Sequence, residues 1–143
     1  MRFSVLLPTR NGGEFLANCI RSVLEQDHGD FELVISDNAN TDATPAIIRG
    51  FAGDPRMRVV RQAEPIPVSE NWTAALNASG GDFVLMMGDD DYLLPGALTR
   101  LDATLLRHGQ PECIVYNGYS YVAPNAIAGN PASFWARKHF PYG

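Results

Sequence analysis

Short apolar runs alternate with longer stretches of helical spacing, and this alternation limits the folds open to the chain more than any other feature. Apolar runs typical of buried strands lie at residues 3–7, 31–35, 57–60 and 83–87. Each run is followed by a stretch whose apolar residues share one helical face; these stretches begin near Glu14, Thr44, Ser69 and Pro95. Repeated strand–helix units of this length predict an α/β fold with a mostly parallel sheet and helices on both of its faces.

Three of these elements carry finer predictions. Residues 83–87 contain no polar side chain, which predicts a central strand buried on both faces. Residues 114–116 are also apolar and predict a further strand. In the stretch after Ser69 we expect Trp72, Ala75 and Leu76 to point inward.

Composition and charge exclude several classes of protein. The 143 residues are 45% hydrophobic and 19% charged, the balance of an ordinary globular domain. The formal net charge is −5 and Lys and Arg form no run, so we expect no nucleic-acid partner. No apolar stretch approaches the roughly 20 residues that span a bilayer, and the N-terminus lacks the pattern of a signal peptide. A cytoplasmic location is therefore expected.

The two cysteines form no metal-ligand pattern. Cys19 falls on the apolar stripe of a predicted helix, and Cys113 opens an apolar run. Because they lie far apart and outside any CxxC spacing, we expect two reduced core cysteines rather than a disulfide or a zinc site.

Polar clusters follow three of the predicted strands, at the edge where parallel sheets bind their ligands. Thr9, Arg10 and Asn11 follow the first strand, Asp37 and Asn38 the second, and Asp89, Asp90 and Asp91 the long apolar run. The Asp37 carboxylate is suited to accept a hydrogen bond from a nucleobase or a ribose hydroxyl. Asp-Asn after a strand is also ordinary turn chemistry, so Asp37 alone does not decide between a site and a turn.

The three adjacent aspartates carry the strongest chemical signal. Neighbouring carboxylates repel one another unless a cation or hydrogen-bond donors compensate. A divalent cation with oxygen ligands would relieve that repulsion and could hold a diphosphate at the same time. The alternative is a solvated acidic loop that leads into the helix at Pro95, where negative charge favours the helix N-terminus.

Two common nucleotide-binding motifs are absent. No GxGxxG follows the first strand, and GxxxxGK[ST] occurs nowhere in the chain. Their absence argues against a dinucleotide-dependent dehydrogenase and against a phosphate-loop NTPase.

Taken in order, the segments SVLLPTRN, SVLEQ, FELVISDNANTDAT and GGDFVLMMGDDDYLLPGAL resemble family 2 glycosyltransferases of the GT-A fold. The resemblance covers residues 1–120 and implies a GT-A, Rossmann-like sheet. It divides the chain into a nucleotide-sugar-binding domain at 1–122 and a segment at 123–143, rich in Pro, Gly and aromatic residues. That segment would lead toward a missing acceptor and catalytic region, so we expect the fold to be truncated at its C-terminus.

The resemblance also assigns roles to the polar clusters. The nucleotide-sugar would contact Asp37, Asn38 and Asp89 together with the loop after the first strand: Pro8, Thr9, Arg10 and Asn11. Counting back from Pro95, Asp90 matches the metal-binding aspartate, with Asp89 and Asp91 beside it. This sequence departs from the family pattern at Gly88, Ser36, Asn38-Ala39 and Arg10, where relatives carry Asp, Asp, Gly-Ser and an aromatic residue respectively.

The function implied by the resemblance is the donor-binding half of an inverting sugar transfer. It requires Mg²⁺ or Mn²⁺, a nucleotide-diphosphate sugar (a UDP-sugar as the first expectation) and a sugar or glycoconjugate acceptor. Asp102 and Glu112 are the only acidic residues after Pro95, and both lie too early to match the family's catalytic base. We therefore expect the general base to be absent from this chain.

The resemblance further suggests polysaccharide or glycoconjugate assembly, with peripheral association of the whole protein with the inner membrane face, and homodimers. Two alternative functions remain open at this stage. One is a nucleotidyltransferase that makes sugar nucleotides, and the other is a non-catalytic nucleotide-sugar-binding module.

Overall fold

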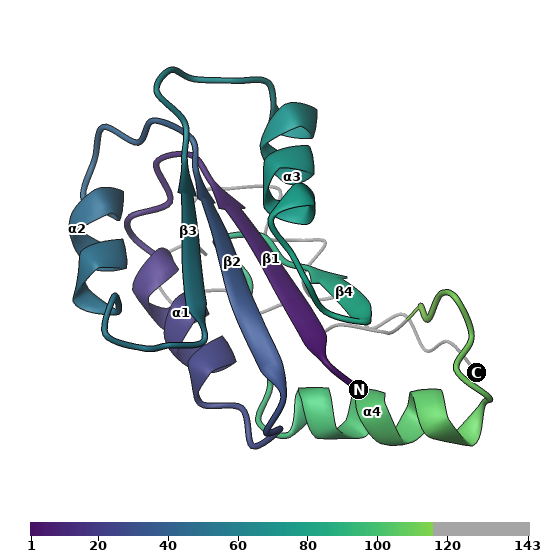
Figure 1. Ribbon diagram of the computed structural model, residues 1–143. Helices are drawn as coiled ribbons and strands as arrows, with labels where there is room; N and C mark the ends of the chain where they lie inside the picture. Colours follow the sequence, from purple (N-terminus) through teal and green to yellow (C-terminus); the bar gives the residue numbers. More distant parts are fainter. Residues whose placement is uncertain (116–143) are drawn as a thin grey trace, which may run out of the picture. The chain divides into compact units, whose positions relative to one another are not determined.

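Four parallel strands form the centre of the protein. The computed structural model describes residues 1–115, and the chain divides into a unit of residues 1–110 and a second unit that begins at Pro111. Within the first unit the strands are ordered β3-β2-β1-β4 (Figure 1), with these bounds: β1 Phe3–Thr9, β2 Phe31–Asp37, β3 Met57–Arg61 and β4 Phe83–Met86. Every pairing is parallel, as the alternation of strand and helix predicts.

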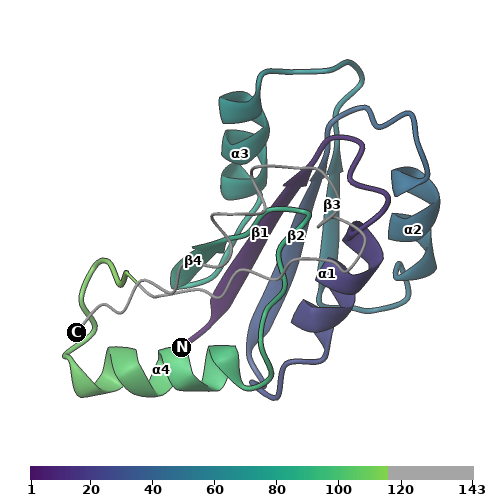
Figure 2. The ribbon, with the colours of Figure 1, turned by 180° about the vertical axis from the view of Figure 1, so that it is seen from behind.

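Helices cover both faces of this sheet, which confirms the predicted layers. Their bounds are α1 Leu16–Leu24, α2 Thr44–Gly50, α3 Val68–Asn77 and α4 Ala97–Arg107. Helix α3 lies over β1 and β2 on one face, and the view from behind shows α1 on the other (Figure 2). Helix α4 lies near the start of β1, where Asp102 accepts a hydrogen bond from the amino group of Met1 at 3.2 Å.

The core follows from the alternation of side chains along β1 and β2. Leu6 and its register partner Val34 point to one face, where they pack with Ala75 and half-buried Trp72 of α3. The residues of these strands that point to the other face are also buried: Val5, Leu7, Leu33 and Ile35. Both strands are therefore central strands, covered on both faces.

Two predictions about β4 and α3 are wrong within the described residues. Strand β4 is the edge of the four-stranded sheet, and its residues Val84 and Met86 are 43% and 58% exposed. Helix α3 covers β1 and β2, so it leaves the side chains that β4 points to the same face uncovered. Leu76 of α3 is likewise 49% exposed, whereas Ala75 is buried as predicted.

The second unit contributes five described residues. Residues 114 and 115 are not in a strand, and Cys113 is exposed, so both predictions for this part of the chain are wrong. Cys19 is buried on α1 as predicted, and both cysteines are unpaired. The predicted boundary at residue 122 and the segment 123–143 lie outside the described residues. None of the helices within residues 1–115 combines the length and the apolar character needed to cross a membrane.

Candidate functional site

The loops after β1 and β4 meet at the carboxyl edge of the sheet. Strand β1 pairs in parallel with both β2 and β4, so the three strands end side by side. The Thr9 hydroxyl, buried at the end of β1, donates a hydrogen bond to Asp89 Oδ2 at 2.6 Å. Gly12 passes so close to this carboxylate that a Cβ on it would lie 2.2 Å from Asp89 Oδ2. Asp89 therefore packs against the β1 loop because Thr9 supplies a hydroxyl donor and Gly12 has no side chain that would collide with it.

Arg10 joins the β1 loop to the β2 loop. Its guanidinium donates to the backbone carbonyls of Asn38, at 2.6 Å, and Ala39. Asn11 makes a second connection, because its side-chain oxygen accepts from the backbone N–H of Thr41 at 2.9 Å. Both Asn11 and Ala39 have a positive φ, of 58° and 49°, a conformation that non-glycine residues rarely adopt. The Arg10 bridge therefore stabilises a loop in which Asn38-Ala39 stands in place of the Gly-Ser pair of the family pattern.

The side chain of Asn38 is committed to the loop before α3. Its amide nitrogen donates to the carbonyl of Ile66 at 2.9 Å, and its oxygen accepts from the N–H of Ile66 at 2.8 Å. Both ends of the amide are thus engaged, and one N–H and one lone pair of the oxygen are left for a ligand. Pro8, half-buried within β1, offers no N–H. Both residues lie at the predicted edge and shape it.

The Asp37 carboxylate is buried at the end of β2 and retains one oxygen for another donor. Asp37 Oδ1 accepts from both nitrogens of Asn40, the backbone N–H at 3.2 Å and the side-chain amide at 2.6 Å. Asp37 Oδ2 lies 3.8 Å from the Arg61 guanidinium, beyond hydrogen-bonding distance, and no donor within residues 1–115 reaches it. This oxygen is a suitable acceptor for an N–H or O–H group of a ligand.

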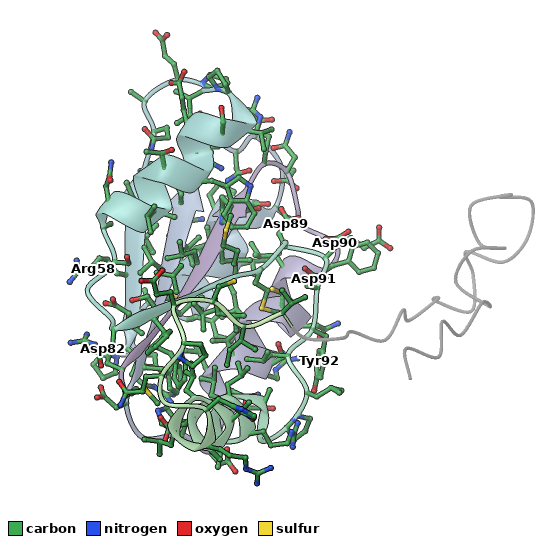
Figure 3. The ribbon with its side chains drawn as sticks, turned by 90° about the vertical axis from the view of Figure 1, so that its right-hand side faces the viewer. Arg58, Asp82, Asp89, Asp90, Asp91 and Tyr92 are labelled. Atoms are coloured by element: carbon green, nitrogen blue, oxygen red, sulfur yellow. The ribbon has the colours of Figure 1, made fainter. Side chains whose placement is uncertain are left out.

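Residues 88–96, which we call the acidic segment, carry Asp89, Asp90 and Asp91 along one stretch of the surface (Figure 3). Asp91 Oδ2 accepts from the backbone N–H of Gly88 at 2.9 Å, and a Cβ on Gly88 would lie 2.9 Å from Asp90 Oδ1. A side chain at position 88 would therefore require the carboxylates of Asp90 and Asp91 to shift. Asp90 has no hydrogen-bond partner in the described part of the chain.

The negative charge of the acidic segment is not neutralised by the side chains around it. In residues 1–115, no Lys, Arg or His nitrogen lies within 4 Å of the three carboxylates. Cys19, on the helix beneath them, responds to this charge. The pKa of its thiol is raised to about 12, first by burial and then by the negative charges of Asp89, Asp91 and Asp90. The segment is a concentrated negative site.

The donors of the acidic segment fit a hard divalent cation. One oxygen each of Asp89 and Asp91, and both oxygens of Asp90, have no hydrogen-bond donor from the described residues. Carboxylate oxygens are the ligands that Mg²⁺ and Mn²⁺ prefer. The described residues hold no ready group of three His, Cys, Asp or Glu ligands for a metal ion. Mg²⁺ does not require three protein ligands, because it usually takes one or two carboxylates and completes its shell with water and phosphate oxygens.

Four residues that shape the site are not among the sequence predictions: Gly12, Asn40 and Arg61 at this edge, and Gln26 at the α4 end of the acidic segment. Gly12 and Asn40 act through a close approach and a turn, which single-sequence patterns do not reveal. Gln26 is different, because it closes the SVLEQ motif and is buried against the acidic segment. The motif was the available signal for its importance.

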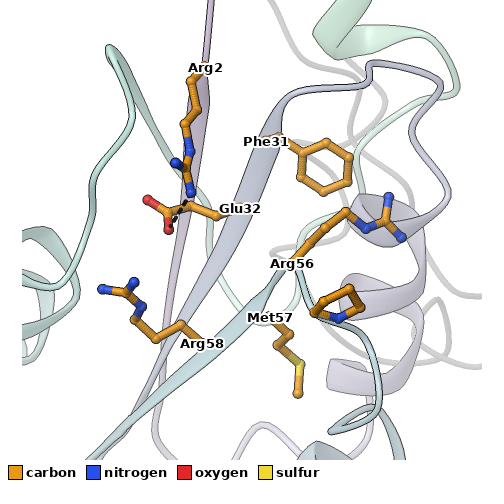
Figure 4. Close-up of a pocket in the computed structure, with 7 residues that line it drawn as sticks. Arg2, Phe31, Glu32, Arg56, Met57 and Arg58 are labelled. Carbon is orange, nitrogen blue, oxygen red and sulfur yellow. Dashed lines mark hydrogen bonds and ion pairs between the residues drawn. The ribbon is translucent and has the colours of Figure 1, made fainter.

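A pocket of about 280 Å³ lies at the opposite end of the sheet (Figure 4). Its lining residues come from the starts of β1, β2 and β3 and the loop before β3: Arg2, Phe31, Glu32, Pro55, Arg56, Met57 and Arg58. Each arginine there is engaged: Arg2 pairs with Glu32, Arg56 with Asp54, and Arg58 with the carbonyl of Ala78. This pocket is separate from the predicted site.

Comparisons with known proteins match most of the chain. The family model described as Glycosyl transferase family 2 matches residues 4–138. The chain is 32% identical, over 88% of its length, to 38% of a GalNAc(5)-diNAcBac-PP-undecaprenol beta-1,3-glucosyltransferase from Campylobacter jejuni.

Two solved structures are similar at 28% identity. One is S. aureus TarS 1-349 in complex with UDP-GlcNAc, with a TM-score of 0.71 over 76% of this chain and 32% of that chain. The other is the mannosyltransferase PcManGT from Pyrobaculum calidifontis in complex with GDP-Man and Mn²⁺, with a TM-score of 0.63 over 72% of this chain and 31% of that chain. The predicted GT-A fold is confirmed by these matches. The chain spans less than half the length of the curated relatives it matches.

Proposed function

Because the chain belongs to glycosyl transferase family 2, we propose that it binds a nucleotide-diphosphate sugar together with a divalent cation. It acts as the donor-binding part of an enzyme that transfers the sugar, with inversion, to an acceptor hydroxyl. The observation that carries the proposal is the uncompensated acidic segment, held by Thr9 and Gly12 at the same sheet edge as the open oxygen of Asp37.

Different residues at this edge contact different parts of the nucleotide-sugar donor. Asp37 Oδ2 accepts a hydrogen bond from the base or the ribose. Asp90, with neighbouring oxygens of Asp89 and Asp91, holds the cation, and Asp89 also lies beside the ribose or the sugar. When bound, the cation supplies neutralisation of the charge that develops on the departing diphosphate. Thr9 keeps Asp89 oriented, so this carboxylate does not have to be organised when the donor arrives.

Similar proteins support both the donor class and the cation. TarS is solved with UDP-GlcNAc, and the Pyrobaculum mannosyltransferase with GDP-Man and Mn²⁺. Uridine is our first choice of base for this chain. We assign no general base, because Asp102 pairs with the N-terminal amino group and Glu112 belongs to the second unit. Glycoconjugate synthesis, association with the inner membrane face and homodimer formation stay predictions.

The nucleotidyltransferase alternative is less well supported. Such an enzyme would need a basic residue after β1 for the triphosphate, and Arg10 is the candidate. Its guanidinium instead donates to two carbonyls of the β2 loop. Pyrophosphate release from a nucleoside triphosphate and a sugar phosphate would revive this alternative.

Thermal unfolding with UDP, GDP, ADP and CDP, each with and without Mn²⁺, tests the proposal. A ligand at one hundred times its Kd stabilises the native state by about 2.7 kcal/mol, a shift of several degrees in Tm. We expect a shift that requires both one nucleotide and Mn²⁺, and its loss in Asp90→Ala. Asp30→Ala, an exposed aspartate at the far end of the sheet, should keep it. A shift unchanged in Asp90→Ala would refute the metal assignment, and no shift with any nucleotide would refute the function.

A further inference from the structure

One face of α1 holds the backbone of the acidic segment in place. Cys19 Sγ lies 3.4 Å from the carbonyl of Gly88, and the Ser22 hydroxyl accepts from the N–H of Leu93 at 3.0 Å. Gln26 lies four residues after Ser22 and one residue beyond Glu25, the C-cap of α1, and so continues the same row. Within residues 1–115, no other group outside the segment and α4 makes a hydrogen bond to the backbone of residues 88–98.

Gln26 makes most of these bonds. Its amide nitrogen donates to the carbonyl of Leu94 at 3.0 Å and lies 3.4 Å from that of Leu93, while also donating to the carbonyl of Ser22 at 2.9 Å. Its oxygen accepts from the N–H of Leu98, in the first turn of α4, at 3.2 Å. The side chain is only 6% exposed. Both ends of the amide are therefore used to fix where the acidic segment ends and α4 begins.

Without hydrogen bonds from α1 and Gln26, little would hold the acidic segment in one conformation. It runs from the end of β4 to α4 without regular structure of its own, and it carries three adjacent carboxylates that repel one another. A loop with few fixed points populates several conformations. If only a fraction of them suits the ligand, the apparent Kd rises in inverse proportion to that fraction.

We propose that Gln26 and Ser22 are positioning residues for donor binding. They touch neither donor nor cation, and they hold the acidic segment in the conformation that presents Asp89 and Asp90 at the edge of the sheet. This inference rests on the function proposed above. It gives the SVLEQ motif a task in the site rather than in the core alone.

A matched pair of serines separates this role from ordinary stability. Ser22 and Ser4 are both buried, and each hydroxyl donates one hydrogen bond and accepts one from a backbone N–H. Ser22 bonds to Cys19 and Leu93 beside the acidic segment, whereas Ser4 bonds to Glu32 and Gly81 at the far end of the sheet. Ser22→Ala and Ser4→Ala therefore each remove a buried hydroxyl with one donated and one accepted hydrogen bond, and the bond lost with Ser4 is the stronger because its acceptor is a carboxylate. Gln26→Met, of similar length, removes the whole amide.

The measurement is the Kd of UDP or GDP, whichever the native chain binds, by calorimetry with and without Mn²⁺. We expect Ser22→Ala to weaken Mn²⁺-dependent binding about fivefold and Gln26→Met about tenfold. Ser4→Ala should stay within about twofold of the native Kd despite a fall in Tm at least as large as that of Ser22→Ala.

Equal effects of Ser22→Ala and Ser4→Ala, or native affinity in a folded Gln26→Met, would overturn this inference and leave the proposed function standing. Absence of Mn²⁺-dependent binding in the native chain would overturn the proposed function, and the inference with it. The two failures are therefore distinguishable.

Discussion

The carboxylates at the two ends of the sheet differ in whether neighbouring residues supply hydrogen-bond donors and positive charge to them. At the amino end, Glu32 of β2 is buried and accepts hydrogen bonds from the Ser4 hydroxyl and the Gly80 N–H, both at 2.6 Å, with Arg2 at 3.4 Å. At the carboxyl end, Asp90 has neither a donor nor a cation from the described residues. The amino end is a completed structural cluster, and the carboxyl end leaves its charge for something that the chain does not supply.

The difference shows that acidic residues alone do not identify a site. Glu32 is as buried as Asp37, its carboxylate lies closer to an arginine than any carboxylate of the acidic segment does, and it lines a pocket. Its role is nevertheless to anchor the turn between α3 and β4. The useful criterion is whether a carboxylate oxygen retains capacity after all neighbouring donors have been counted.

The largest expected effect is on stability, at the amino end. Glu32→Ala should lower the free energy of unfolding by about 3 kcal/mol, because it leaves the Ser4 hydroxyl and the Gly80 N–H without their acceptor. Urea unfolding measures this loss. Nucleotide affinity of the folded fraction should not change, and a weakened Kd would show that the two ends are coupled.

A pair of glycine substitutions should separate the ends further. In Gly81→Ala the new Cβ would lie 2.8 Å from the backbone nitrogen of Ser4, and in Gly12→Ala 2.2 Å from Asp89 Oδ2. Backbone cannot move aside easily, so Gly81→Ala should destabilise the protein by about 2 kcal/mol with unchanged affinity.

A side-chain carboxylate can move, so Gly12→Ala should push Asp89 off Thr9. We expect it to weaken Mn²⁺-dependent nucleotide binding about tenfold, with less than about 1 kcal/mol lost in stability. Calorimetry and urea unfolding on both variants give the comparison. The reverse pattern would contradict the division of the sheet into a structural end and a binding end.

We expect a smaller effect from low pH, a fall in stability that comes in part from protonation of Glu32. Burial raises the pKa of this carboxyl, but the Ser4 hydroxyl, the Gly80 N–H and the charges of Arg2 and Arg58 outweigh it, so the pKa lies below its ordinary value of 4.5. A lowered pKa contributes stability above pH 4.5 that is lost as the pH falls through the folded-state value. Glu32→Gln should therefore flatten the fall in Tm below pH 4.5, and a profile parallel to that of the native protein would argue against this cause.

The smallest expected effect is a difference in reactivity between the two cysteine thiols, measured without any change in stability. Because burial and the acidic segment raise the pKa of Cys19 to about 12, it should remain an unreactive thiol in the native state at pH 8. Exposed Cys113 should react with a thiol reagent at once. One group should therefore titrate in buffer and two in denaturant. Rapid reaction of Cys19 in buffer would mean that the acidic segment lifts away from α1.

Much of this fold is predictable from the sequence, because strand and helix periods alternate and Pro, Gly and polar clusters mark the ends of elements. The error at β4 has a physical cause. An apolar run shows that a strand avoids water in the whole protein, but it does not show which neighbour covers it. Val84 and Met86 are apolar and exposed within the described residues.

The location of the site can be predicted from the sequence, but most of its individual side-chain contacts cannot. Asp37, Thr9, Arg10 and Asp89 do gather at one edge, as the ends of parallel strands require. The sequence does not reveal that Arg10 would bridge two loops, or that Asn38 would pair with Ile66. Those choices depend on loop geometry, which no residue period encodes.

The position of β1 between β2 and β4 sets an order of events during synthesis. Arg2, at the start of β1, bonds to Asp82 at the start of β4, and 80 residues separate them along the chain. At translation rates of about 5–20 residues per second, β1 is made roughly 4–16 s before the strand that covers its second edge. During that interval β1 and β2 can pair, but one edge of β1 stays open to a neighbouring nascent chain. The time at which residues 83–86 leave the ribosome is therefore the time at which both edges of β1 can first be paired.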